Sequence, residues 1–209
     1  MGRRIPILFF LGLAVYSAFL GLSDDEAYYW VLAQKPALGY AFHPPAVAWL
    51  IAVFQRLFGG LLGADSPFVV RLPAVFCSTL ILSLCLNWLD RSGLASTHKN
   101  RAAAVVLAFF SFFSLSWMMV PDLPLFLGWT LAFTGTWALC FSQSKKLDYW
   151  KVGLGVALSI LSKFSGILVL FSVGLALFCW APPRVRRKAI WGVGLGFVAA
   201  VLPTLYWNA

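Results

Sequence analysis

Long uninterrupted apolar runs divide this 209-residue sequence, and they suit a lipid bilayer better than water. Hydrophobic residues make up 61% of the chain and charged residues 11%, which is well below the roughly 25% charged residues of soluble domains. Several runs approach the ~20 residues that a helix needs to cross a bilayer. They lack the period-two alternation of half-buried strands. The sequence therefore predicts an all-α, polytopic transmembrane helix bundle, in which each helix satisfies its own backbone polar groups.

The charged residues predict the orientation of these helices. Of the 16 Lys and Arg residues, 12 fall in four short clusters between apolar runs, whereas five of the seven acids fall on the other side. Basic loops stay in the cytoplasm, so we expect a cytoplasmic N-terminus and an acidic outer face. The chain has a net charge of +9, and this clustering of its basic residues indicates that they face membrane lipid rather than nucleic acid. Arg71, near the outer end of its span, is expected to extend to the interface. The predicted spans are 5–22, 67–88, 102–120, 123–141 and 189–207, with 152–180 as a short hairpin and 23–66 as an outer loop.

Two apolar segments do not fit a simple crossing. Residues 44–63 are interrupted by Gln55 and Arg56, and a crossing there would move every later basic loop outside. We therefore expect a juxtamembrane helix in the outer interface, paired with one that begins at Ser23. Residues 152–180 have basic loops on both sides, which predicts a short hairpin or two thin spans, with one long tilted span as the alternative.

Acidic and aromatic residues of the first outer loop form the strongest chemical signal. Ser23 and Glu26 fit a capping box, which satisfies the first amides of a helix. A helix that starts there places Asp25, Tyr28 and Tyr29 on one side, with Glu26 about 100° away. Carboxylates at a membrane surface serve as general bases or metal ligands, whereas the aromatic rings also suit the membrane interface.

Three later polar residues are further candidates. Asp122 lies at the outer end of a span, where it either caps that helix or meets Asp25 to activate a hydroxyl. Lys163 lies at the tip of the 152–180 hairpin, and an intramembrane lysine indicates function. It either pairs with an acid or binds an anionic phosphate. His43 is a polar loop residue or a substrate contact, and with His98 expected inside, a histidine-based zinc site is not expected.

Several motifs, in order along the chain, resemble those of one family. They are Asp25–Trp30, Leu38–Tyr40, His43–Pro45 with Ala48–Ile51, Pro121–Leu125, Leu161–Gly166 and Pro203–Asn208. The sequence resembles the polyprenyl-phosphate-sugar-dependent glycosyltransferases of the glycosyltransferase C superfamily (family 39/83-like), the group of protein mannosyltransferases and lipid A aminoarabinose or galacturonic acid transferases. It departs from them at Phe42, where the family usually has an acid before His-Pro-Pro. Family members are much longer, so residues 1–209 resemble the N-terminal part of the transmembrane glycosyltransferase domain.

The resemblance implies roles for the candidate residues. Asp25 would be the general base on the acceptor, and Asp122 would orient the acceptor or Asp25. Glu26 would support Asp25 or help it to hold a divalent metal ion, if one binds. Glu26, Tyr28, Tyr29 and His43 would contact substrate, and Lys163 would offset the charge of the leaving phosphate.

The implied function is an inverting hexosyl- or pentosyltransferase in the bacterial inner membrane. Its partners would be a polyprenyl-phosphate sugar donor and an acceptor, either a lipid A-type glycolipid, a glycan or a protein, on the periplasmic or extracellular face. The alternatives are a transporter or flippase, and an inactive truncated fragment. Transporters usually show internal repeats, and this sequence has none that we find.

Overall fold

The computed structural model describes residues 4–112 and 116–209, and these residues form helices and no strand. The predicted all-α fold is confirmed. The chain separates into two compact units, which are described here one at a time: residues 1–36 with 45–124, and residues 37–44 with 125–209. Among the described residues, three helices are long and apolar enough to cross a membrane: α4 (Pro67–Arg91), α6 (Asp122–Phe141) and α9 (Pro183–Asn208).

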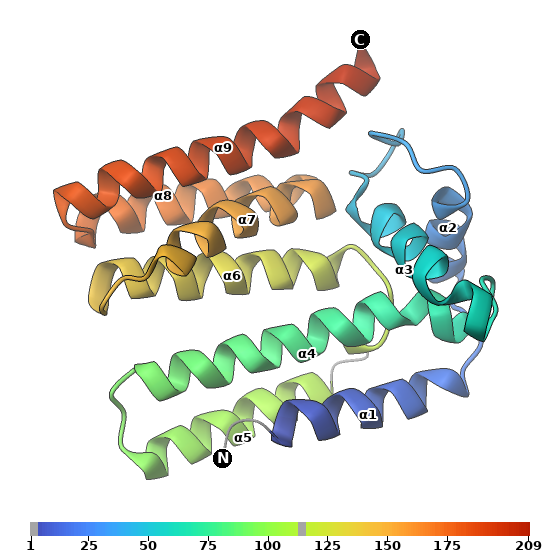
Figure 1. The fold of residues 1–209 in the computed structure, drawn as a ribbon, viewed down its shortest axis with the longest axis horizontal. Helices are drawn as coiled ribbons and strands as arrows, with labels where there is room; N and C mark the ends of the chain where they lie inside the picture. Colours follow the sequence, from blue (N-terminus) through green and yellow to red (C-terminus); the bar gives the residue numbers. More distant parts are fainter. Residues whose placement is uncertain (1–3, 113–115) are drawn as a thin grey trace. The chain divides into compact units, whose positions relative to one another are not determined.

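The first unit is built around α4. This helix packs against α1 (Arg4–Ala18), α3 (Ala46–Leu62) and α5 (Ser96–Phe112), and α3 in turn packs against α2 (Asp24–Ala33). Figure 1 shows α2 and α3 at the end of the unit where α1 finishes and α4 begins. There, Ser66 caps α4 by accepting a hydrogen bond from the Val69 amide, and Pro67 occupies the first turn, where its missing N–H costs nothing.

Two helices of the first unit differ in their bounds from the spans expected from hydropathy. The helix expected over 5–22 ends at Ala18, and the one expected over 102–120 begins earlier, at Ser96, and is described as far as Phe112. The described residues 116–121 form turns before α6 begins at Asp122. Residues 113–115 lie outside the described part of the chain. Leu20 and Gly21 therefore belong to the α1–α2 connection and Met119 to the turn before α6, where their backbone groups bind side chains of the unit.

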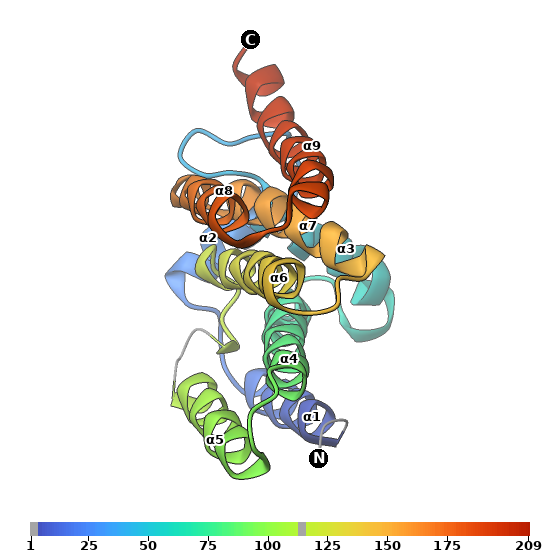
Figure 2. The same cartoon turned by 90° about the vertical axis from the view of Figure 1, so that its left-hand side faces the viewer.

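The second unit holds most of α6 together with three later helices. These are α7 (Lys146–Ser162), α8 (Leu168–Trp180) and α9, with a 3-10 turn, η2 (Phe164–Ile167), before α8. The four α-helices lie side by side in both views (Figures 1 and 2). At 1.5 Å per residue, the 17 residues of α7 and the 13 of α8 measure about 26 and 20 Å, so both helices are short. Their core consists of small and branched residues: Ala132, Leu139, Val152, Val156, Val169, Val173, Leu177, Ala181 and Ala189.

Glycines bring the backbones of α7 and α9 into direct contact. A Cβ atom added to Gly153 would lie 2.7 Å from the Gly192 carbonyl oxygen, closer than real Cβ contacts allow. A Cβ atom on Gly196 would likewise collide with the Gly153 carbonyl oxygen. Close approach of this kind replaces side-chain packing where lipid offers no hydrophobic driving force between helices.

Candidate active site

A capping box stabilises the first turn of α2, as the sequence predicts, and this prediction is confirmed. The Ser23 hydroxyl accepts a hydrogen bond from the Glu26 amide at 3.3 Å, and the Glu26 carboxylate accepts one from the Ser23 amide at 3.0 Å. These bonds satisfy amides that a helix start leaves without partners. They also turn the Glu26 side chain back toward the α1–α2 connection.

Glu26 forms a bidentate ion pair with Arg71 of α4. The Arg71 Nε atom lies 2.8 Å from Glu26 Oε1, and Nη2 lies 2.6 Å from Oε2. Both residues have 0% of their surface exposed. The expectation that Arg71 extends to the membrane interface is therefore wrong. The guanidinium turns inward because a carboxylate and several carbonyl groups lie there, and these replace the water that it gives up.

Arg71 also holds the end of α1. Its guanidinium donates to the carbonyl oxygens of Ser17, Leu20 and Gly21 at 3.2, 2.6 and 2.5 Å. It lies 4.7 Å from the centre of the Trp117 ring, within cation–π range. The residues after Ala18 thus direct their carbonyl groups to Arg71 rather than continuing the helix, which explains why α1 ends early.

Glu26 is ionised in this environment. Burial raises the pKa of its carboxyl group, but hydrogen bonds from Arg71 and from the amides of Ser23 and Met119, with the charge of Arg71, lower the pKa below its usual value of 4.5. The Met119 amide, in the turn before α6, donates to Oε1 at 3.2 Å. The Glu26 carboxylate of α2 therefore binds both Arg71 of α4 and the turn that holds Met119.

Asp25 and Asp122 both lie within electrostatic reach of Tyr29. Burial raises the pKa of the Tyr29 hydroxyl, and Tyr28, Asp25 and Asp122 raise it further. Tyr29 is 5% exposed, and its ring meets that of Tyr28 edge to face, with centroids 5.2 Å apart. Asp25 is exposed, whereas Asp122 is half-buried in the first turn of α6. The charges of both acids therefore act on the Tyr29 hydroxyl group and favour its protonated form.

His43 and Lys163 belong to the second unit. His43 lies in the 37–44 segment, which packs against α9 at Gly39. A Cβ atom added to Gly39 would lie 3.2 Å from the Trp207 ring. Lys163 is half-buried between α7 and η2, where its amide donates to the Ser159 carbonyl oxygen and its own carbonyl oxygen accepts from Gly166. That either side chain meets Asp25 stays a prediction.

The residues that the structure describes contain no group of three or more His, Cys, Asp and Glu side chains that could hold a metal ion. Both oxygens of Glu26 already accept hydrogen bonds from protein donors. Binding of a divalent ion by Asp25 and Glu26 stays a prediction.

Arg71 was not predicted from the sequence to belong to the site. The available signal was its position, because Arg71 is a basic residue near the acidic outer end of a span, contrary to the charge rule. Such a charge within a membrane protein usually has an acidic partner. That reasoning points to an acid of the outer loop, although it does not choose among Asp24, Asp25 and Glu26.

The apolar helices and the acidic surface helix define a polytopic membrane protein with a glycosyltransferase C-type fold. The structure resembles that of the S. cerevisiae protein O-mannosyltransferase Pmt1-Pmt2 complex bound to the sugar donor, with a TM-score of 0.62 and 18% identity, over 99% of this chain and 34% of that chain. Residues 42–207 match the dolichyl-phosphate-mannose-protein mannosyltransferase family, and the chain belongs to that family. The resemblance found in the sequence is confirmed.

A curated relative is the lipid A galacturonosyltransferase RgtD of Rhizobium johnstonii. It is 26% identical over 233 aligned residues, which cover all of this chain and 44% of the relative. The chain thus spans less than half the length of both proteins.

Proposed function

We propose that this chain carries the acidic site of a membrane glycosyltransferase. The enzyme moves a sugar from a polyprenyl-phosphate donor to a glycolipid, glycan or protein acceptor on the outer face of the bacterial inner membrane. The observation that carries this proposal is the match of residues 42–207 to this family, in a chain whose Asp25 and Asp122 both act electrostatically on the buried Tyr29. The family match and the relatives do not favour a transporter or flippase.

In the proposed reaction, Asp25 is the general base. It takes the proton of the acceptor hydroxyl as the acceptor oxygen forms its bond to the anomeric carbon of the sugar. The bond from that carbon to the phosphate oxygen breaks on the opposite face, and its electron pair leaves with the polyprenyl phosphate, so the configuration inverts. A phosphate leaving group needs little protonation, and one base is enough, unlike the two carboxyl groups of glycosidases.

The other residues of the site support this step. Tyr29 donates a hydrogen bond toward Asp122 or the acceptor, and Asp122 orients the acceptor. Glu26 fixes the first turn of α2, and so the direction of Asp25, through its ion pair with Arg71. Lys163 offsets the negative charge that develops on the leaving phosphate, while Tyr28 and His43 contact the sugar or the acceptor.

Separate Asp25→Asn and Asp122→Asn substitutions in the full-length protein test this proposal. General-base catalysis contributes about 10²–10⁴-fold, so we expect Asp25→Asn to lower the rate of sugar transfer by that factor, with unchanged abundance in the membrane. The assay follows labelled sugar from polyprenyl-phosphate mannose or galacturonic acid into the glycolipid and protein fractions. Asp24→Asn is the matched control, because Asp24 is an exposed acid in the same turn. Transfer at the wild-type rate by Asp25→Asn would refute the assignment.

A further inference from the structure

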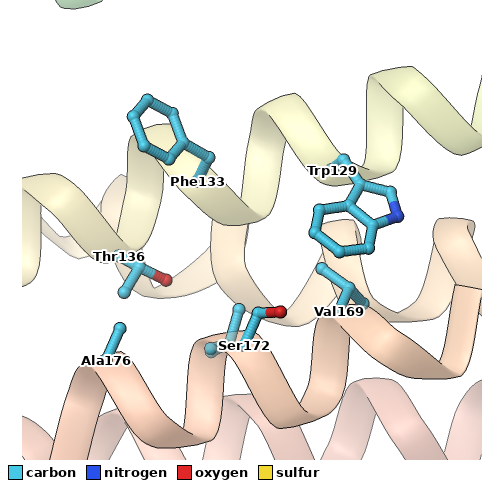
Figure 3. A pocket seen from close by; sticks show the side chains of 7 residues that line it. Trp129, Phe133, Thr136, Val169, Ser172 and Ala176 are labelled. Atoms are coloured by element: carbon cyan, nitrogen blue, oxygen red, sulfur yellow. The ribbon is translucent and has the colours of Figure 1, made fainter.

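A groove between α6 and α8 lies wholly within the second unit (Figure 3). It has a volume of about 110 Å³, and its walls are mostly apolar. Figure 3 shows Trp129 and Thr136 of α6 facing Val169 and Ala176 of α8, whereas the Phe133 ring points away from α8. The lining residues are Trp129, Phe133 and Thr136 from α6, and Val169, Ser172, Val173 and Ala176 from α8.

Thr136 contributes a buried hydroxyl group without a hydrogen-bond partner in the described structure. The residue is 6% exposed, and its side chain projects from α6 toward α8. Thr79, Thr130 and Thr134 each donate to the carbonyl oxygen four residues earlier, at 2.8 Å. A hydroxyl group buried in apolar surroundings without such a bond costs free energy, so the Thr136 hydroxyl indicates an acceptor atom that occupies the groove.

Ordered water fits this groove poorly. A buried water usually makes about three hydrogen bonds, and apolar cavities stay dry and take apolar molecules. The other hydroxyl group in the lining, that of Ser172, already donates to the Leu168 carbonyl oxygen at 3.0 Å. An aliphatic chain that carries one acceptor atom matches the walls and satisfies Thr136 as well.

The groove lies close to a strongly basic end of the unit. Thr136 is five residues before the end of α6 at Phe141, and Ala176 is four residues before the end of α8 at Trp180. Each residue therefore lies about 6–8 Å along the helix axis from the end of its helix. The α6–α7 and α8–α9 connections begin there, at the same end of the unit (Figure 1). Exposed basic residues crowd these connections: Lys145, Lys146, Arg184, Arg187 and Lys188.

Little in the second unit neutralises this charge. The sequence of the unit contains eight Lys and Arg residues and one acid, Asp148. That acid already forms an ion pair with Lys151, with 3.4 Å between Oδ1 and Nζ. Clusters of basic residues beside membrane helices attract anionic head groups.

We propose that the α6–α8 groove binds an anionic phospholipid from the leaflet that contacts the basic connections. One acyl chain lies between Trp129 and Ala176, and the Thr136 hydroxyl donates to its ester carbonyl oxygen. The phosphate then lies among the exposed basic residues at the ends of α6 and α8. This site is independent of the proposed transfer reaction.

Native mass spectrometry of the full chain, released from nanodiscs, tests the proposal with phosphatidylglycerol and phosphatidylcholine as the two probes. We expect phosphatidylglycerol to remain bound in preference to phosphatidylcholine. One neutral hydrogen bond corresponds to about a 3- to 10-fold change in affinity, so Thr136→Val should weaken retention by that factor. Thr134→Val is the matched control, since Thr134 is 4% exposed and its hydroxyl group is satisfied within α6.

A second pair of variants keeps the test decisive if Thr136→Val folds poorly. Ala176→Leu fills the groove without adding a polar group, and Arg184→Gln with Arg187→Gln removes two exposed charges. Both should lower retention of phosphatidylglycerol several-fold. Equal retention of the two lipids, or retention that neither Thr136→Val nor Ala176→Leu changes, would overturn the proposal.

Discussion

At the scale of single residues, two neighbouring acids of α2 have opposite environments. Asp25 is exposed, whereas Glu26 is buried and accepts hydrogen bonds from the amides of Ser23 and Met119 and from Arg71. Adjacent helix positions point about 100° apart, so the Glu26 side chain can anchor the turn while the Asp25 side chain stays exposed. The anchoring acid, Glu26, and the proposed general base, Asp25, are therefore different residues, and their substitutions should have different effects.

Arg71→Met should destabilise the folded chain. The substitution leaves the Glu26 carboxylate buried without its counter-ion, and the loss of one partner of a buried pair costs about 3–5 kcal/mol. Unfolding by denaturant in detergent micelles measures the change in free energy. Arg56→Met is the matched control, because Arg56 is an exposed arginine on α3. A double variant, Glu26→Met with Arg71→Met, should lose less stability than the two single variants summed, and strict additivity would show that the pair is not coupled.

The stability of the chain should fall in acid because of Glu26. The pKa of its carboxyl group is lower in the folded state than its usual value of 4.5, so the unfolded state binds the proton more readily. The contribution of Glu26 to the free energy of unfolding is therefore complete above about pH 4.5 and is lost as the pH falls through the lower, folded-state pKa. Melting temperatures between pH 3 and 7 test this, and Glu26→Gln should flatten the acidic limb of the profile.

Residue-level prediction from sequence succeeded where partners are close in the chain. The capping box of Ser23 and Glu26 spans three residues, and its pattern is local. Arg71 and Glu26 are 45 residues apart, and the carbonyl groups that also bind Arg71 carry no sequence signal at all. Their meeting depends on how α1, α2 and α4 pack, which hydropathy and charge do not specify.

At the scale of elements, the contact between α7 and α9 depends on glycines, which have no side chain to separate the two backbones.

Hydropathy predicted where most helices lie, because a bilayer demands long apolar runs. It did not predict where α1 ends, since the apolar residues after Ala18 pass into a connection. Nor did it predict the close approach of α7 and α9, because glycines are also common in membrane helices for other reasons.

Gly196→Ala should destabilise this contact, whereas Gly194→Ala should not. A Cβ atom at position 196 meets the Gly153 carbonyl oxygen, while at position 194 it meets nothing within 4 Å. Overpacking costs about 1–3 kcal/mol, and Ala in a helix is otherwise favoured over Gly by about 0.5–1 kcal/mol. The two substituted positions lie two residues apart on α9, and thermal unfolding in the same detergent compares the two variants directly. Equal melting temperatures would contradict the close approach of the two backbones.

At the scale of the whole molecule, the proposed active face follows from the distribution of charge. The acidic loop and the basic connections alternate along the chain, so the positive-inside rule leads us to expect the acidic loop outside. The structure adds that the acids of the first unit include an internal anchor, Glu26, and do not all face the solvent.

Cysteine labelling of intact cells tests this orientation. In a background without the four native cysteines, a membrane-impermeant maleimide should modify Asp65→Cys from outside. Lys99→Cys and Lys146→Cys should react only after the membrane is permeabilised, because both positions lie in basic connections that we expect inside. Labelling of position 146, but not 65, in intact cells would reverse the proposed orientation.

The 45-residue separation of Glu26 and Arg71 also has a consequence for biosynthesis. Glu26 leaves the ribosome well before Arg71 does, and a carboxylate cannot be buried without its counter-ion at an acceptable cost. The first turn of α2 must therefore remain hydrated at the membrane surface until α4 has been inserted. Maturation of the first turn of α2 then waits for α4, and the order of synthesis becomes part of how the proposed active surface is assembled.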